Sequence, residues 1–186
     1  MHRVGLLISD HFQILGLSTL SIFEFANQVA GEPFYDCTVY SERGGSVKSS
    51  YGFGVDSQPI AADTEVDTWL IAGVLTPLEL PASPGIVDFL KTYAPRARRV
   101  AGICTGAFVL GQAGLLSERR ATTHWVHAQS LKALHPTTRV EEDRIFIIDD
   151  HVWTSAGLTA GLDMALGMVE KDLGAEVARS VAHLLV

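Results

Sequence analysis

The stretch Val100-Ala101-Gly102-Ile103-Cys104-Thr105-Gly106-Ala107-Phe108-Val109-Leu110 joins an apolar run to a segment with helical spacing through a cysteine that has a glycine on either side. This pattern predicts a strand, a sharp turn and a helix, with Cys104 at the turn. Small neighbours let the backbone bend tightly and expose the central side chain, as in a nucleophile elbow. Amide groups at the start of the helix favour a thiolate, so we expect a lowered pKa for Cys104. The alternative is a small buried cysteine that packs at a strand end.

Composition limits the kind of protein to which this stretch belongs. The 186 residues are 47% hydrophobic and 19% charged, which favours one domain with one buried core. A net charge of −7 gives no electrostatic footprint for DNA or RNA. The two cysteines, Cys37 and Cys104, resemble neither a disulfide framework nor a metal-ligand set, so we assign no metal and no cofactor. The first apolar run, Val4–Ile8, is too short to span a membrane, and we expect a cytoplasmic protein.

Apolar runs and apolar residues at helical spacing predict an alternation of strands and helices. We expect strands over 4–8, 35–40 (with Cys37 in the core), 68–72 and 98–103, short strands within 41–59, and a hairpin over 145–155. We expect helices over 17–29 with Ser18 as cap, and over 85–93, 105–113, about 125–134, 158–173 and 175–186. This alternation predicts an α/β fold in which a mostly parallel sheet has helices on both faces. Such sheets bind ligands at the carboxyl ends of their strands, where the elbow lies.

A reactive Cys104 would need a proton-transfer group and donors for a developing oxyanion. The amide of Thr105 is one candidate donor, and the turn Gly73-Val74 after the neighbouring strand is a second. His124 follows two threonines at a junction between an extended segment and a helix, which makes it the candidate imidazole. The alternative for His124 is a histidine that caps the helix, or one that contacts the residues of the site without contacting a ligand itself. The candidate ligand-binding set is therefore Gly73, Val74, Cys104, Thr105 and His124.

Two segments carry a resemblance to a known family. Residues 101–110, 113–116 and 120–125 form the more specific segment, and residues 154–163 support it. Both are similar to the ThiJ/PfpI branch of the class I glutamine amidotransferase-like superfamily, and in particular to the sensor domain that precedes a helix-turn-helix domain in one subgroup of AraC-type transcriptional regulators. Isocyanide hydratases share much of the same pattern. The resemblance covers nearly the whole chain and implies a flavodoxin-like three-layer sandwich that forms a homodimer.

The sequence departs from the enzymes of this superfamily at two positions. Enzymes place an acidic side chain near the start of the first helix, where Gly16 stands here. Val74 replaces the second glycine of their oxyanion turn, although its amide can still donate. The resemblance therefore implies a domain that senses a small-molecule effector near Cys104 without turnover. The alternative is a cysteine-dependent hydratase or hydrolase with Cys104 as nucleophile and His124 assisting, and a third possibility is reversible oxidation of Cys104.

The chain stops within the apolar helical stretch Ser180–Val186. We therefore expect residues 1–186 to be a single ThiJ/PfpI-like domain from the N-terminal part of a longer regulator. DNA contact would then belong to a helix-turn-helix domain outside this stretch, which agrees with the negative charge of the stretch itself.

Overall fold

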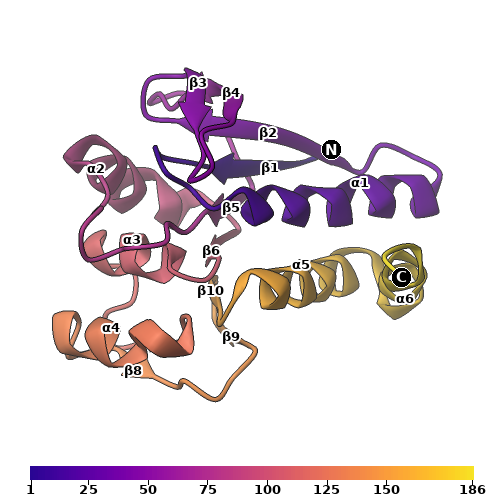
Figure 1. Ribbon diagram of the computed structural model, residues 1–186. Coiled ribbons are helices and arrows are strands. Elements are labelled where there is room, and N and C mark those ends of the chain that lie inside the picture. The colour runs from indigo at the N-terminus through magenta and orange to yellow at the C-terminus, as the bar shows by residue number, and fades with distance from the viewer.

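The computed structural model describes residues 1–186 as an eight-stranded sheet between two layers of helices (Figure 1). The strands, in their order across the sheet, are β3 (Gly45–Lys48), β4 (Gly54–Pro59), β2 (Tyr35–Ser41), β1 (His2–Leu7), β5 (Thr68–Ile71), β6 (Arg99–Gly102), β10 (Val152–Ser155) and β9 (Phe146–Asp149). The six central strands are parallel, and β3 and β9 are antiparallel to their neighbours. This confirms the predicted flavodoxin-like three-layer fold.

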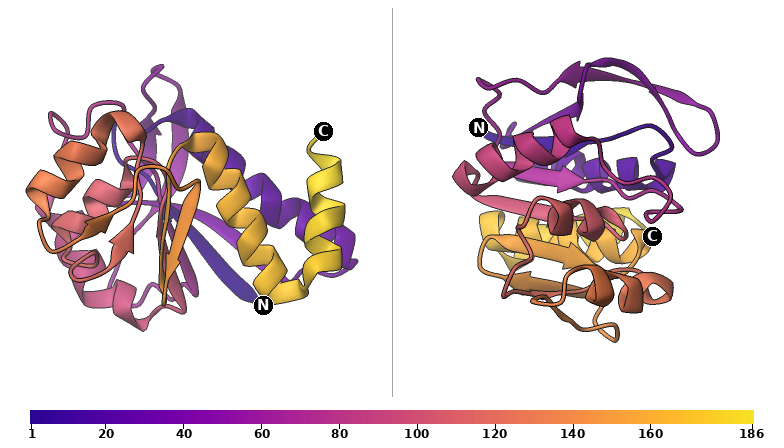
Figure 2. Two further views of the ribbon diagram at one scale, coloured as in Figure 1. Left: turned by 90° about the horizontal axis from the view of Figure 1, so that it is seen from below. Right: turned by 90° about the vertical axis from the view of Figure 1, so that its left-hand side faces the viewer.

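The helices divide between the two faces of the sheet (Figure 2). One face carries α1 (Ser18–Ala30), α5 (Leu158–Leu173) and α6 (Ala175–Leu184), and the other carries α2 (Pro84–Tyr93), α3 (Gly106–Gln112) and α4 (Ala128–Leu134). Short 3-10 helices are η1 (Ile14–Leu17), η2 (Ala94–Arg96) and η3 (Trp125–His127), and β7 (Arg120–Ala121) pairs with β8 (Arg139–Val140). None of the helices is long and apolar enough to cross a lipid bilayer.

Strand β1 shows why the central strands are apolar throughout. Val4 and Leu6 pack into the core beneath α1 and α5, whereas Leu7 packs into the core beneath α2 and α3. Successive side chains of a strand point to opposite faces, and both faces of this sheet are covered. A strand in this position must therefore be apolar at nearly every residue.

The predicted elements are confirmed to within a few residues, with two local differences. Cys37, predicted in the core, is exposed, because β2 pairs with β4 only at Tyr40 and Ser41 and its first half forms an open edge. Ser18, predicted to cap α1, does not cap it. The 3-10 turn η1 leads directly into the helix, and the Ser18 hydroxyl donates instead to the carbonyl of Leu15.

A cluster of charged side chains around the buried Asp172 lies at the amino-terminal ends of the central strands. The side chain of Asp172, near the end of α5, is fully buried and forms ion pairs with Arg98, 2.8 Å away, and with Arg99. The Tyr35 hydroxyl at the start of β2 donates to the same carboxylate over 2.9 Å, and Arg99 Nε donates to the Thr68 hydroxyl over 2.8 Å. The carboxylate thus ties α5 to β2 and β6, and Arg99 extends the cluster to β5.

Replacing Asp172 with alanine should lower the free energy of unfolding by about 3–5 kcal/mol, because the buried Arg99 guanidinium would lose its counter-charge. Urea denaturation measures this loss. Glu65→Ala is the matched control, since it breaks the exposed Arg3–Glu65 pair and should leave the denaturation midpoint unchanged. Equal midpoints for the two variants would contradict a stabilising role for the cluster.

Candidate functional site

Cys104 lies on the sharp turn between β6 and α3, as the glycine spacing predicted. Its φ of 54° is left-handed, a conformation that residues other than glycine rarely adopt. The flanking glycines are required by close packing. A Cβ on Gly102 would lie 2.8 Å from the amide nitrogen of Ala107, and one on Gly106 would overlap the carbonyl oxygen of Ile71. The turn is therefore pressed against β5, and only glycine fits on either side of the cysteine.

Buried hydroxyl groups hold this turn in place. The Cys104 amide donates to the Ser155 hydroxyl over 3.2 Å, and the Thr123 hydroxyl donates to the Cys104 carbonyl over 3.0 Å. The Thr105 hydroxyl donates to the Val74 carbonyl over 2.6 Å. The sequence reasoning missed these roles of Thr123 and Ser155, although both residues lie within the two segments that carry the resemblance.

The Cys104 thiol is buried, with 3% of the residue exposed. Burial raises the pKa of this thiol to about 11, and a hydrogen bond from the Thr105 amide only partly opposes that effect. The predicted lowering of the pKa is therefore wrong. Desolvation penalises the thiolate more than one amide group stabilises it, and α3 begins two residues beyond the sulfur. The thiol is protonated at neutral pH.

The Gly73-Val74 turn lies directly against the elbow. A Cβ on Gly73 would overlap the Thr105 hydroxyl and would lie 3.0 Å from the Thr105 amide nitrogen. The Gly73 carbonyl accepts from the Gln13 amide over 2.9 Å, but the amides of Gly73 and Val74 donate no hydrogen bond within the protein. Buried amide groups without partners are costly. The Val74 amide is thus free of partners within the protein, and its predicted role as a donor to a ligand stays a prediction.

Gly16 stands where the enzymes of the superfamily have an acidic residue. It lies in η1 and is buried. A Cβ there would meet only the Cβ of Ala72, at 3.5 Å, which is an ordinary contact. The backbone would thus accept a side chain at position 16. Burial and the Thr105 amide account for the shift of the Cys104 pKa, and no carboxylate contributes to it.

His124 lies at the start of η3, where its Nδ1 accepts from the amide of Val126 over 3.4 Å. This contact corresponds to the capping alternative, and no hydrogen bond joins His124 to Cys104. The His124 ring stacks on Trp125 with 5.9 Å between centroids. Both rings line a cavity of about 420 Å³ that also contains Gly157 and Asp163. The structure thus places His124 on the wall of a cavity that Cys104 does not line, and no hydrogen bond joins its ring to the sulfur.

No group of three or more His, Cys, Asp and Glu side chains is arranged to hold a metal ion. The elbow therefore offers backbone amides, a neutral thiol and hydroxyl groups as its polar groups. The Cys104 thiol has no base in contact with it.

Comparison with known proteins identifies the family. The model of the DJ-1/PfpI family matches residues 4–171. The chain belongs to the DJ-1/PfpI family. It is 32% identical to the HTH-type transcriptional regulator GlxA of Rhizobium meliloti over 184 residues, which cover 98% of this chain and 56% of that regulator. This DJ-1/PfpI chain thus spans little more than half the length of the relative.

Two further proteins are similar to this DJ-1/PfpI chain. It is 40% identical to the isonitrile hydratase of Pseudomonas putida over 95 residues, which cover 51% of the chain and 40% of that enzyme. The crystal structure of an AraC family transcriptional regulator from Pseudomonas putida has the same fold, with a TM-score of 0.91 at 23% identity and full coverage of both chains. The curated relatives thus include an HTH-type transcriptional regulator and an enzyme that matches half of the chain.

The buried thiol of this DJ-1/PfpI chain should react slowly with iodoacetamide. With a pKa of about 11, on the order of 1 in 1,000 Cys104 thiols or fewer is ionised at pH 7.5. In a Cys37→Ser background, mass spectrometry should show alkylation of Cys104 more slowly than alkylation of glutathione, with a rate that rises up to about pH 11. Alkylation faster than that of glutathione at pH 7.5 would contradict the raised pKa and favour a redox-sensing thiol.

The close approach of α3 to β5 predicts that Gly106→Ala destabilises the DJ-1/PfpI fold by roughly 1–3 kcal/mol, because the new Cβ would displace the Ile71 carbonyl. Gly157→Ala is the control, since a Cβ there meets nothing within 4 Å. Thermal unfolding of both variants measures the difference. If both melt at the temperature of the wild type, the elbow is not as tightly packed as described.

Proposed function

We propose that this chain is the ligand-sensing and dimerisation domain of an AraC-type transcriptional regulator, and that it binds a small metabolite at the Cys104 elbow without turnover. The observation that carries the proposal is that Gly73 and Val74 are buried residues whose amides form no hydrogen bond within the protein. They lie beside a protonated thiol and an acid position that holds Gly16. The site therefore keeps its binding groups and lacks a group to move protons.

The balance between binding and chemistry follows from these groups. Amides directed at a carbonyl or carboxylate oxygen bind the ground state of a ligand whether or not a reaction follows. Nucleophilic attack by Cys104 would first require loss of its proton, and neither His124 nor a carboxylate is in contact with the thiol. Recognition is thus the function that this arrangement supports best.

A role in transcription fits the relatives and the charge. GlxA is named an HTH-type regulator, and this chain matches little more than half of its length. With a net charge of −7, the chain would leave phosphate contacts to a separate DNA-binding domain. A ligand that prefers one dimer arrangement would shift the position of such domains.

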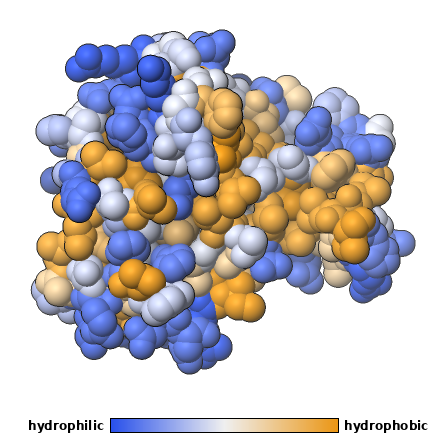
Figure 3. Space-filling model, viewed as in Figure 1, coloured by the Kyte–Doolittle hydropathy of each residue, from blue (hydrophilic) through white to orange (hydrophobic).

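Exposed apolar side chains support self-association as a homodimer. Leu15, in η1, and Leu75 and Leu78, on the loop after β5, are each more than half exposed. The space-filling view shows apolar surface across the middle of one face of the molecule (Figure 3). Apolar surface of this kind is typical of protein interaction sites.

An isocyanide hydratase-like lyase, or an amidase that uses Cys104 as nucleophile, is the second candidate. The identity of 40% to isonitrile hydratase and the retained elbow favour it. Under this candidate, the Thr105 and Val74 amides would stabilise an oxyanion and His124 would assist.

One set of assays separates the two candidates. The wild-type chain should show no turnover of isocyanides, glyoxals or small amides, because the neutral thiol lacks a proton acceptor. A thermal-shift screen of small carboxylates and carbonyl compounds should still find stabilising ligands, by about 2.7 kcal/mol at a hundred times the dissociation constant. Cys104→Ser should keep this stabilisation, since backbone amides carry the binding.

Gly16→Asp tests whether a carboxylate at this position allows turnover by Cys104, and Gly16→Asn is its control. The position accepts a Cβ, so both variants should fold, and only the carboxylate can accept a proton. Turnover by the wild type that Cys104→Ser abolishes would overturn the sensing proposal in favour of the enzyme. A screen in which no compound stabilises the chain would overturn ligand binding at the elbow.

A further inference from the structure

The side chain of Gln13, on the loop between β1 and η1, carries a buried oxygen without a hydrogen-bond partner. Gln13 is partly exposed as a residue, but its Oε1 atom is shielded from solvent and no group of the protein donates to it. A buried acceptor without a donor destabilises a folded chain, and native proteins contain few such atoms. A ligand that donates a hydrogen bond to this oxygen would remove that cost.

The backbone pairing of Gln13 directs its side chain toward the elbow. Phe12 and Val74 form an antiparallel bridge, and next to it the Gln13 amide donates to the Gly73 carbonyl over 2.9 Å. Gln13 therefore lies opposite Gly73, and opposite residues of an antiparallel pair point to the same face. A Cβ on Gly73 would point into the Thr105 hydroxyl. The Gln13 side chain thus leaves the backbone on the side of Thr105.

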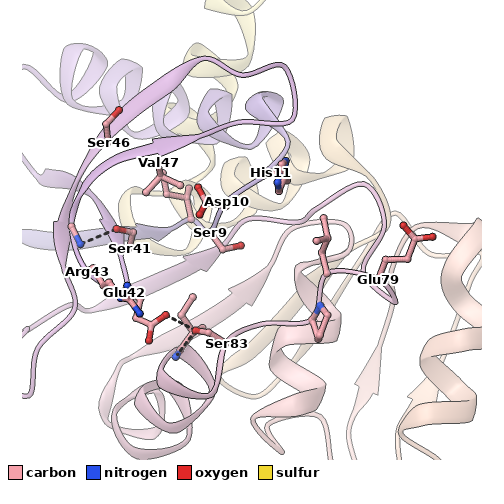
Figure 4. A pocket seen from close by; sticks show the side chains of 15 residues that line it. Ser9, Asp10, His11, Ser41, Glu42, Arg43, Ser46, Val47, Glu79 and Ser83 are labelled. Carbon is pink, nitrogen blue, oxygen red and sulfur yellow. Dashed lines mark hydrogen bonds between the residues drawn. The ribbon is translucent and has the colours of Figure 1, made fainter.

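The largest cavity beside this loop does not account for the buried oxygen. It has a volume of about 550 Å³ and is formed by the segment after β1, the turn between β2 and β3, and the loop between β5 and α2. Ser9, Asp10 and His11 line one wall of it, whereas Gln13 does not line it (Figure 4). The Gln13 oxygen therefore belongs with the elbow and not with this cavity.

The groups on this side of the elbow are complementary to a neutral ligand. Gly73 and Val74 are buried, and their amides form no hydrogen bond within the protein. These amides can donate to a carbonyl, and Gln13 Oε1 can accept from an N–H group. The Cys104 thiol is protonated, and no charged side chain contributes to its pKa. A charged ligand would therefore be buried here without a counter-charge, which is costly.

We propose that Gln13 determines the specificity of the elbow for a neutral amide or lactam. The ligand N–H donates to Gln13 Oε1, and the ligand carbonyl accepts from the amides of Gly73 and Val74. A lactam presents its N–H and its carbonyl on the same edge, so one small ring can meet both segments. This inference rests on the proposed binding function of the elbow and adds to it the chemical class of the ligand.

Titration of the chain with 2-pyrrolidinone and with γ-butyrolactone, followed by NMR, tests the proposal. The two rings have nearly the same shape, but only the lactam has an N–H group. The wild type should bind the lactam about tenfold more tightly, because the lactone leaves a buried acceptor unpaired. N-methyl-2-pyrrolidinone, whose nitrogen carries no hydrogen, should also bind about tenfold more weakly than the lactam.

Gln13→Met keeps the length of the side chain and removes the acceptor. This variant should bind the lactam and the lactone equally. It should unfold at a temperature no lower than that of the wild type, since Gln13 Oε1 has no partner to lose. Ser49→Ala is the matched control. The Ser49 hydroxyl is also buried without a partner, but Ser49 bridges Phe12 from the side of β3, so the variant should keep the preference for the lactam.

The outcomes separate this inference from the proposed function. Equal binding of lactam and lactone by the wild type, or a preference that persists in Gln13→Met, would overturn the role of Gln13 and leave ligand binding at the elbow intact. A lower unfolding temperature for Gln13→Met than for Ser49→Ala would show that the oxygen stabilises the free chain and would also overturn it. If no compound of any class stabilises the chain, the proposed function fails, and this inference fails with it.

Discussion

The close approach of α3 to β5 is the constraint on which the candidate site depends. The backbone at Gly106 touches the last carbonyl of β5, and the Thr105 hydroxyl bonds to the Val74 carbonyl just beyond that strand. Close packing leaves room for glycine alone at positions 73 and 106, and at position 102 a Cβ would meet the backbone of Gly106 and Ala107. The same packing brings the Gly73-Val74 turn beside the elbow. The glycine pattern and the placement of this turn thus share one steric cause.

The strained turn is maintained by its surroundings. A left-handed residue other than glycine costs of order 1–3 kcal/mol and persists only where neighbouring groups determine it. At Cys104 these groups are the hydroxyls of Ser155 and Thr123, which bond its amide and its carbonyl. At the amino-terminal ends of the strands, Asp172 fixes the end of α5 to the sheet. Side-chain contacts therefore hold the sheet at both ends of its strands, including the end at which the elbow lies.

Local patterns in the sequence predicted the parts of this structure that local physics determines. Apolar runs marked the central strands, and glycine spacing marked the elbow at Cys104. Properties that depend on distant residues were missed. The burial that raises the Cys104 pKa arises from packing across the sheet, and the exposure of Cys37 depends on where β4 joins β2. The cavity at Asp10 was also missed, because three loops far apart in sequence assemble it.

The hydroxyl groups that shape the elbow have an evolutionary consequence. Neither Ser155 nor Thr123 bonds the Cys104 sulfur, and both act on its backbone. The shape of the turn is therefore independent of the acid–base groups that a reaction would require. A descendant could gain or lose a proton-transfer residue at position 16 without altering this turn. Selection can thus alter chemistry and recognition separately on this scaffold, which makes sensors and enzymes close neighbours in sequence space.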